Sequence, residues 1–589
     1  MNRLEKISSF FDALFVRERG TNLTMRGEQL IKNLRPAEKL LFVVLTIIAT
    51  VSALLLLTRI HQTFLVEIPA EGGSFVEGLI GNPRFINPIL AISDTDKDIG
   101  ALVYSGLLRA MPDGTYRNDL AENLSVSEDG LVYDITIKEN AFFHDGTPVT
   151  SDDIIFTIEK SLDPIIKSPK RANWEGVTIE KIGTKSLKFT LKKPFAPFMD
   201  ALTIGILPKH IWESASSEEF PFSEWNVTPI GSGPYKVSTT KRNSAGIPSS
   251  ISLTSWEKHN DGKPYIKSIT FKFFQNEKSL LDAYDAGEID SIARISKEAA
   301  ATMSQKRNLL VSSMPRVFGA FFNQNVAPVF LNKEVRKSLS ILAPKDKIVN
   351  EVLLGFGSVA LGPTPLQKRT AEENAPDRLE EAKEILAKAG WKIDEADGIL
   401  KKKTKSETTS LSFTISTADT PELKQTAEIL KEAWQKLGAR IDIKVFEASD
   451  LNQNVIRPRK YDVLLFGEVI KNENDLYSFW HSSERNDPGL NIPLYANITA
   501  DKLLEEMRSE QDKDKRREKL GLLTEEIDED IPAIFLFVPS TLYLPSPNIK
   551  NISLPTVGGP SERFASIHGW YIETDKVWRM FAKQTEDTI

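Results

Sequence analysis

Residues 121–159, AENLSVSEDGLVYDITIKENAFFHDGTPVTSDDIIFTIE, predict a strand, a tight turn and a capped helix in succession. Between residues 131 and 137 the apolar side chains alternate with their neighbours, which is the period of a strand with one buried face. Asp145-Gly146 supplies the turn, because glycine adopts positive φ without steric cost. Thr150 and Asp153 have the spacing of a capping box before an apolar helical segment. The pattern alone predicts a fold element and no activity.

The same stretch resembles the family-5 extracellular solute-binding proteins of ABC importers, which bind peptides, dipeptides and nickel. Other segments resemble further landmarks of that family and follow in the family's order, from about residue 74 to the C-terminus. They are GNPRFINPIL (81–90), VYSGLLRAMPDGTY (103–116), PIGSGPYK (229–236), AYDAGEID (283–290), FFNQNVAPVFLNKEVRKSL (321–339) and YANITADKLLEE (495–506). The resemblance implies an α/β fold of the type II periplasmic-binding-protein kind, with two lobes and an extra small domain.

The length of the chain agrees with more than one core. Single cores stop growing near ~250–300 residues, so 589 residues require at least two lobes. The landmarks place the expected boundaries. We expect a cytoplasmic segment at 1–39, a transmembrane helix at 40–58, a linker at 59–73, lobe I at 74–110, 226–312 and 528–589, an inserted small domain at 111–225, and lobe II at 313–527.

Lobe II contains a clear β-α-β pattern. Residues 411–416 alternate as a strand, and Thr420-Pro421 then supplies a cap with proline at the first helical position. The helix ends at Gly438, and residues 441–445 resume a strand. This order favours a right-handed parallel unit within an α/β sheet. Trp434, on the apolar face of the helix, is expected in the core rather than against a ligand.

Residues 40–58, LLFVVLTIIATVSALLLLT, form an uncharged apolar run between Lys39 and Arg59. A helix needs ~20 such residues to cross a hydrocarbon core of ~30 Å, and this run just reaches that length. The alternatives are a cleaved signal peptide and a buried core helix. A signal peptide has a shorter apolar region of ~7–15 residues and a small-residue cleavage site. Since 39 residues precede the run and RIHQTFLVEIP follows it, we expect an uncleaved membrane anchor.

The charge around this run predicts its orientation. Residues 1–39 carry eight Lys and Arg against five Asp and Glu, and three of the basic residues lie close to the span. The positive-inside rule then keeps the N-terminus in the cytoplasm and exports everything after Arg59. We therefore expect a single-pass protein of the cell membrane with its binding domain on the outer face.

Several classes of function are not supported by the residues. Cysteine is absent, which removes disulfides, thiol catalysis, cysteine-ligated metals and a lipid-modified cysteine anchor. The six histidines include no pair at metal-binding spacing. Gly231-Ser-Gly233 is followed by Pro234 rather than by the helix that a phosphate loop needs, and turn and cap roles account for Asp145, Asp152 and Asp153. A net charge of −7 does not indicate nucleic acid. We expect no catalysis, no cofactor and no metal.

The resemblance also bears on the ligand. Peptide-binding members of the family place an aspartate in lobe II, within a "GW–D–DP" segment, where it pairs with the α-amino group of the ligand. The matching segment here is FGEVIKNEND, residues 466–475. With Glu473-Asn474 set against the family's Asp-Pro, the aspartate position falls on Ile470 and the preceding tryptophan on Gly467. A buried ammonium needs a paired carboxylate, so the resemblance implies that the usual peptide-amine anchor is missing.

Other side chains near this segment are candidates for the ligand site. Glu468 could replace the anchor, provided that no bulge separates it from the face of Ile470. Trp480 and His481 either line the cleft or are buried structural aromatics. The candidate ligand-binding residues are thus Phe466, Glu468, Ile470, Trp480, His481 and Asn323.

The sequence therefore predicts a membrane-tethered solute-binding protein of an ABC importer. It would close two lobes on a peptide or similar solute and present it to a permease, as a monomer. Two alternatives remain open at this stage. One is a binder of another solute, such as an oligosaccharide, and the other is a membrane-fixed sensor or adaptor with the same fold.

Overall fold

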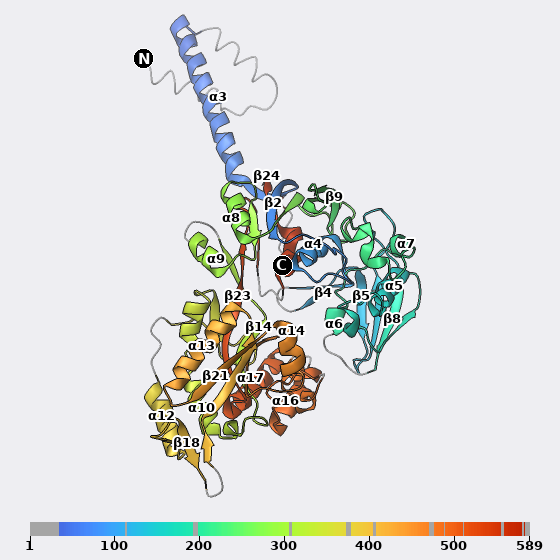
Figure 1. Cartoon of the computed structure of the whole chain (residues 1–589). Helices are drawn as coiled ribbons and strands as arrows, with labels where there is room; N and C mark the ends of the chain where they lie inside the picture. The colour runs from blue at the N-terminus through green and yellow to red at the C-terminus, as the bar shows by residue number, and fades with distance from the viewer. Residues whose placement is uncertain are drawn as a thin grey trace. The chain divides into compact units, whose positions relative to one another are not determined.

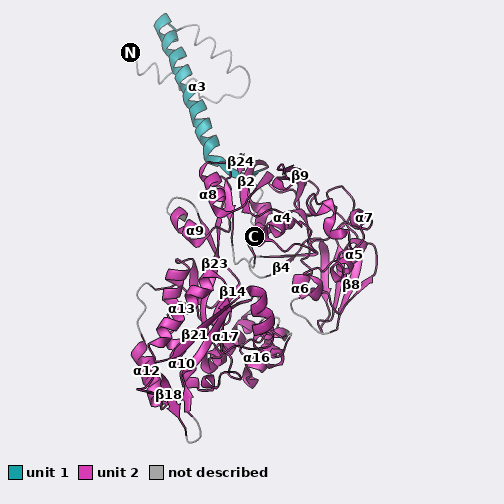
Figure 2. Ribbon diagram, in the orientation of Figure 1, with its two compact units in different colours: residues 1–70, 574–589 teal, residues 71–573 magenta. Residues whose placement is uncertain are grey.

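The computed structural model of this chain describes residues 34–111, 115–192, 198–304, 309–372, 378–404, 408–470, 476–487, 489–510, 512–554, 559–579 and 582. The predicted segment 1–39 and the positions Glu473 and Asn474 therefore lie wholly or mostly outside the described residues. The chain divides into two units, residues 1–70 with 574–589, and residues 71–573 (Figure 2).

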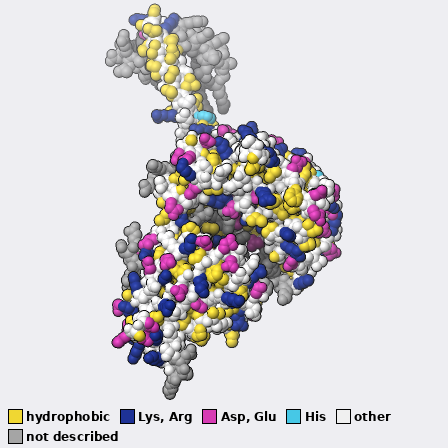
Figure 3. All heavy atoms as spheres, in the orientation of Figure 1, with side chains coloured by type: hydrophobic (Ala, Val, Ile, Leu, Met, Phe, Trp, Pro, Cys, Tyr) yellow, Lys and Arg dark blue, Asp and Glu magenta, His cyan; other side chains and the backbone are white. Residues whose placement is uncertain are grey.

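The first unit is dominated by the helix α3, Pro36–Phe64. Proline at the first helical position loses no hydrogen bond there, and the Glu38 carboxylate accepts a bond from the Arg35 backbone N–H at 3.0 Å. None of the side chains of α3 is buried, and hydrophobic side chains cover it (Figure 3). Its length and composition suffice to cross a membrane.

The expected linker at 59–73 has regular structure instead. Residues 59–64 contain neither glycine nor proline, so α3 continues through them to Phe64. The residues that follow include the β-branched Val66 and Ile68 and form the strand β1, Leu65–Ala70, which pairs with β24, Glu573–Trp578, near the C-terminus.

The second unit is built on a large mixed sheet, to which lobe I and lobe II each contribute strands (Figure 1). The lobe I strands run in the order β12, β2, β11, β10 and β9, which are Ser291–Ala293, Gly72–Ile80, Ile266–Phe274, Pro248–Ser255 and Tyr235–Arg242. The lobe II strands run in the order β21, β20, β22 and β14, which are Arg440–Phe446, Ser412–Ala418, Val463–Val469 and Arg316–Phe322. Each lobe has its own cluster of buried apolar residues.

One strand, β23 (Ala533–Leu544), belongs to both lobes. Its first half pairs with β14, with Ala533 opposite Phe321. Its second half pairs with β13 (Leu310–Ser313), with Tyr543 opposite Leu310, and then with β12. The predicted boundary at 528 falls inside α17 (Lys513–Asp530), and the pairing passes from one lobe to the other about ten residues later. The backbone between the lobes is therefore a continuous strand at this crossing.

The small domain has a sheet of its own, in the order β5, β6, β8 and β7, which are Ala121–Val126, Val132–Ile137, Ser186–Leu191 and Val177–Lys181. The predicted capping box begins α5, Ser151–Leu162, where the Asp153 carboxylate accepts a bond from the Thr150 N–H at 2.8 Å. Alternate residues of β6 are buried in a separate apolar core.

The β-α-β unit of lobe II is present as predicted. The strands β20 and β21 are parallel, and α13 (Pro421–Gln435) connects them. Trp434 on α13 is fully buried and donates its indole N–H to the Leu339 carbonyl at 2.9 Å. It belongs to the core, in agreement with the expectation.

Candidate functional site

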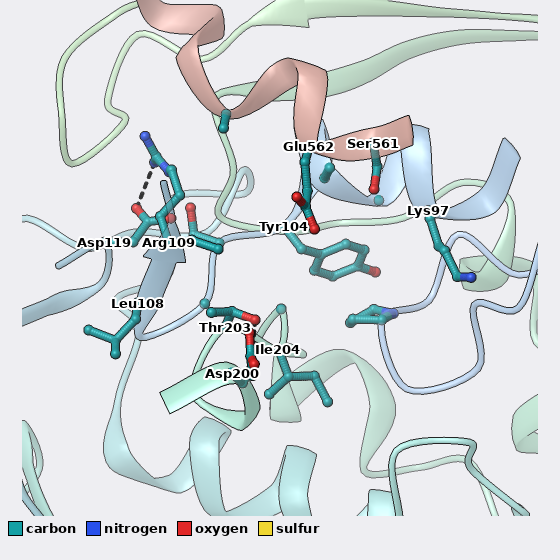
Figure 4. A pocket seen from close by; sticks show the side chains of 18 of the residues that line it. Lys97, Tyr104, Leu108, Arg109, Asp119, Asp200, Thr203, Ile204, Ser561 and Glu562 are labelled. Atoms are coloured by element: carbon teal, nitrogen blue, oxygen red, sulfur yellow. Dashed lines mark hydrogen bonds and ion pairs between the residues drawn. The ribbon is translucent and has the colours of Figure 1, made fainter. Parts of the chain in front are cut away.

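A cavity of about 420 Å³ lies in lobe I where it meets the small domain (Figure 4). This volume is in the range of small-molecule sites. Its walls come from distant parts of the chain: α4 (Asp94–Val103), the segment 104–110 with β3 (Leu108–Ala110), η1 (Arg171–Asn173), α6 (Phe198–Ala201) and η9 (Pro560–Gly569).

The walls of this cavity carry both signs of charge beside aromatic surface. The positive residues are Lys97, Arg109 and Lys170, the negative residues are Asp119, Asp200 and Glu562, and the aromatic residues are Tyr104, Trp174 and Phe564. Figure 4 shows the Tyr104 ring in the middle of this group, with Glu562 and Ser561 on η9 facing Asp200, Thr203 and Ile204. Such a surface suits a polar ligand that carries both charges.

Arg109 is the most strongly held charge in the wall. Its guanidinium lies 2.9 Å from the Asp119 carboxylate and 3.5 Å from Asp261, and Asp261 also pairs with Lys138 at 2.8 Å. Burial by itself would lower the pKa of Arg109, but the two carboxylates outweigh it and the pKa is raised. Arg109 therefore stays charged and fixed.

Three of the sequence landmarks meet behind this wall. Gly233 donates its N–H to the Val103 carbonyl at 2.8 Å, and the His144 N–H donates to the Gly231 carbonyl at 2.8 Å. A Cβ at Gly231 or Gly233 would overlap the backbone of residues 102–104. These glycines are therefore needed for close backbone packing, and the motifs that carry the resemblance are structural here.

The opposite wall, η9, is held by a buried arginine. Arg563 is 3% exposed and bonds the Asp98 carboxylate at two points, 2.8 and 3.1 Å. It also bonds Glu77 on β2, which accepts a further bond from the Tyr543 hydroxyl at 2.9 Å. Because Ser561, Glu562 and Phe564 flank Arg563, this network sets the position of their side chains in the cavity.

A pair of histidines lies next to the same wall. The His259 and His568 rings are joined by a hydrogen bond of 3.0 Å, and His259 Nε2 lies 3.5 Å from the Ser105 hydroxyl, which lines the cavity. Burial, and then the nearby Arg109 charge, lower the pKa of His568 to about 4. Burial also places the pKa of His259 well below its ordinary value. Both rings are neutral at pH 7.

The predicted residues of lobe II lie elsewhere, and two of them, Phe466 and Glu468, are on β22. The pairing of β22 with β14 has no register shift up to Val469, so Phe466 and Glu468 lie on one face. Ile470 follows the strand, and its N–H donates to the Pro315 carbonyl at 2.8 Å, which continues the pairing by one residue. The condition for Glu468 to share a face with Ile470 is therefore met. Ile470 is 2% exposed and belongs to the lobe II core.

Glu468 is a buried carboxyl without a hydrogen-bond partner for Oε1 in the described part of the chain. It is 2% exposed, and burial raises its pKa well above the ordinary value for glutamate. A buried ionised carboxylate without a partner is costly, so the protonated form is favoured in this conformation.

The remaining candidates have structural surroundings. Trp480 is fully buried, with the rings of Tyr495 and Phe535 at 6.0 and 5.6 Å. The Asn323 amide donates to the Arg459 carbonyl at 2.8 Å, and its oxygen accepts bonds from two following N–H groups. His481 stacks on Tyr477 with ring centres 4.2 Å apart. The structure thus gathers Phe466, Glu468 and Ile470, and places Asn323 in a turn.

Most of the cavity wall could not be predicted from the sequence. Tyr104 and Arg109 lie in the segment 103–116, whose resemblance to the family indicates no site. Glu562, Asp200 and Lys170 come from stretches without a recognisable motif, so only the fold brings them together. Among the described residues, no three His, Asp or Glu side chains gather as a metal site would require.

Comparisons with known proteins agree with this architecture. The model of the bacterial extracellular solute-binding proteins, family 5 middle region, matches residues 115–487. The oligopeptide-binding protein AppA of Bacillus subtilis is 28% identical over 517 residues, covering 86% of this chain and 92% of AppA. The oligopeptide-binding protein OppA of the same organism is 23% identical over 508 residues, covering 81% of this chain and 89% of OppA.

Solved structures show the same likeness. The structure of Bacillus subtilis AppA in complex with a nonapeptide has a TM-score of 0.61 at 27% identity, covering 86% of this chain and all of AppA. The structure of Campylobacter jejuni NikZ in complex with Ni(L-His) has a TM-score of 0.60 at 25% identity, covering 85% of this chain and 99% of NikZ.

Proposed function

Because this chain belongs to the family-5 bacterial extracellular solute-binding proteins, we propose that it captures a peptide or similar small solute outside the cell and delivers it to an ABC permease. The observation that carries the proposal is the mixed charge of the lobe I cavity. The wall offers the positive groups Lys97 and Arg109 and the negative groups Asp200 and Glu562, which can pair with both charges of a zwitterionic ligand.

The second part of the proposed site is the β22 face of lobe II. Phe466 supplies an apolar contact. Glu468 is the one acidic group among the predicted lobe II residues, because Ile470 takes the position that the resemblance assigns to an aspartate. We infer that Trp480 and Asn323 support this face from behind, since both are fully buried. His481 follows Trp480 in the chain, and we place it at the edge of this proposed face.

The proposed capture step is closure of the two lobes on the ligand. Two connections carry the movement, the segment between β13 and β14 and the strand β23. Closure would bring the β22 face toward the lobe I cavity and exclude water from the ligand. The protein acts as a monomer, and the permease recognises the closed form.

The tether in this proposal is α3. The helix is long and apolar enough to span a bilayer, and the basic excess before it favours an N-terminus in the cytoplasm. The binding unit then lies on the outer face, where an importer needs it. Protease added to intact cells should remove the binding unit while α3 stays in the membrane.

The proposal is tested by ligand identification and by charge removal. Native mass spectrometry of the purified protein should reveal a bound peptide-like solute, and calorimetry then gives its affinity. Glu562→Gln should weaken binding roughly tenfold, since a charge-assisted bond is worth about 1.5–3 kcal/mol. Glu257→Gln is the matched control, because that side chain is 78% exposed. Equal affinities for the two variants would contradict the assigned cavity.

A further inference from the structure

An aromatic cluster lies at the C-terminal end of α3. The Trp578 indole N–H donates to His61 Nδ1 at 2.9 Å, and the Trp578 ring stacks on Phe64 with centres 6.0 Å apart. Trp578 comes from β24, whose pairing with β1 brings it back to the helix. The Arg579 N–H also donates to the Phe64 carbonyl at 2.9 Å. The C-terminal strand is thus joined to the helix at several points.

The cluster is exposed although it is apolar. Phe64 is 52% exposed and Trp578 is 36% exposed. Basic side chains are close to it in the chain, since Arg59 precedes it on α3 and Lys576 on β24 is 64% exposed and pairs with Glu67 on β1 at 3.9 Å. Large aromatic rings between basic side chains are the composition of a membrane–water interface.

The height of the cluster above the apolar run agrees with that location. The cluster begins at His61, three residues and roughly 4.5 Å beyond the run, and ends at Phe64, roughly 9 Å beyond it at 1.5 Å per residue. The polar layer on each side of the hydrocarbon core is roughly 5–7 Å thick. Side chains tilt toward the N-terminus of their helix, so the rings of His61 and Phe64 lie closer to the core than their own Cα atoms.

We propose that Trp578, with His61 and Phe64, forms an interfacial anchor that lies in the headgroup layer of the outer leaflet. The proposal rests on the membrane span assigned to α3 under the proposed function. The bilayer is the occupant because the patch is continuous with the apolar surface of α3 and begins within the thickness of the polar layer. The anchor holds the paired strands β1 and β24 at the membrane surface, through His61 and Phe64 before β1 and through Trp578 at the end of β24.

The test uses the full chain reconstituted in lipid nanodiscs with and without brominated phosphatidylcholine, which quenches tryptophan emission at short range. Trp578 is one of nine tryptophans. We expect a quenched component of roughly a tenth of the emission in the unchanged protein. It should disappear in Trp578→Phe and persist in Trp225→Phe, a half-buried tryptophan of the other unit.

The outcomes separate the two assignments. Failure of the protein to enter nanodiscs would overturn the span of α3, and the interfacial anchor with it. Entry with the same quenching in the unchanged protein and Trp578→Phe would overturn the interfacial anchor alone. Circular dichroism of Trp578→Phe checks that the fold is kept, because phenylalanine preserves the ring stacking on Phe64.

Discussion

Arg563 and Asp98 form a buried two-point ion pair that joins η9 to α4, with N–O distances of 2.8 and 3.1 Å. The Asp98 side chain is fully buried and Arg563 is 3% exposed. Two carboxylates, those of Asp98 and Glu77, thus share one guanidinium, and Arg294 lies 3.1 Å from Asp98 as a second positive charge. The two negative charges of Asp98 and Glu77 are thus balanced by the two positive charges of Arg563 and Arg294, and buried charges are tolerated only when they are paired in this way.

Removal of Arg563 should be strongly destabilising. Arg563→Ala leaves Asp98 and Glu77 buried without their main partner, so the free energy of unfolding should fall by about 3–5 kcal/mol. Denaturant titration measures this. Lys278→Ala is the control, because Lys278 and its ion-pair partner Asp282 are both exposed. This substitution should change the free energy of unfolding by less than about 0.5 kcal/mol. Similar losses in both variants would contradict the role given to the buried network.

Two glycines should respond in opposite directions to alanine. A Cβ at Gly231 overlaps the Val103 carbonyl, so Gly231→Ala should destabilise the protein by more than about 1 kcal/mol. Gly521 lies within α17 with open space around its Cβ position, so Gly521→Ala should stabilise by about 0.5–1 kcal/mol. Thermal unfolding compares them directly. A stable Gly231→Ala variant would disprove the close-packing explanation of the GSGPY motif.

Much of the fold could be predicted from short sequence patterns, because the interactions that form these elements involve residues close together in the sequence. The capping box at Thr150 and Asp153 needs only neighbours in sequence, and so does the β20–α13–β21 unit. The helical continuation to Phe64 was not predicted, since a charged Arg59 marks the end of an apolar run and not the end of a helix.

The cavity could not be predicted in the same way. Tyr104, Asp200 and Glu562 are brought together by the sheet and by η9, and no spacing in sequence records that proximity. The lack of a hydrogen-bond partner for Glu468 Oε1 among the described residues is also a property of the packed lobe. The resemblance identified the family through turn and packing residues, which determine the backbone, while the side chains that select a ligand have no motif.

Ligand should compact the binding unit if the lobes close. Closure buries the surface between them, so small-angle scattering should show a smaller radius of gyration with saturating ligand. The pairing of β23 with both lobes limits the movement to bending and twisting of a strand that stays intact. An unchanged radius at saturation would contradict the hinge mechanism.

The histidine pair should make stability depend on pH. The pKa of His568 is about 4 in the folded protein and near the ordinary 6.5 when unfolded, so the unfolded state binds more protons between these values. Stability should therefore fall as the pH is lowered from about 6.5 to about 4, by at most about 1.4 kcal/mol per pH unit for each histidine.

The comparison that isolates this effect is His568→Gln, which keeps a hydrogen-bonding side chain beside His259. Its stability should fall less steeply than that of the unchanged protein over the same pH interval. The charged groups around the pair, Arg109, Asp119 and Asp261, are the same in both proteins. Parallel stability curves would show that the pair does not titrate as described.

The buried carboxyl of Glu468 leads to a prediction about stability. Burial raises the pKa of Glu468, so the folded protein keeps a proton that the unfolded chain loses above about pH 4.5. The free energy of unfolding should therefore fall as the pH rises from about 4.5 toward the raised pKa of the folded protein. Glu468→Gln removes the ionisable group and should raise the free energy of unfolding at pH 7 by about 1–3 kcal/mol. A loss of stability would mean that the carboxylate is ionised and paired.

Acetylated ligands test whether Glu468 acts as an ammonium anchor. A true ammonium anchor would make binding roughly ten- to hundredfold weaker when the ligand amine is acetylated, since charge-assisted hydrogen bonds are worth about 1.5–3 kcal/mol. With Ile470 buried in the core and Glu468 2% exposed, we expect acetylation to change the affinity much less. If the unchanged protein rejects acetylated peptides and Glu468→Gln alone abolishes free-amine binding, Glu468 becomes accessible on closure and is the anchor.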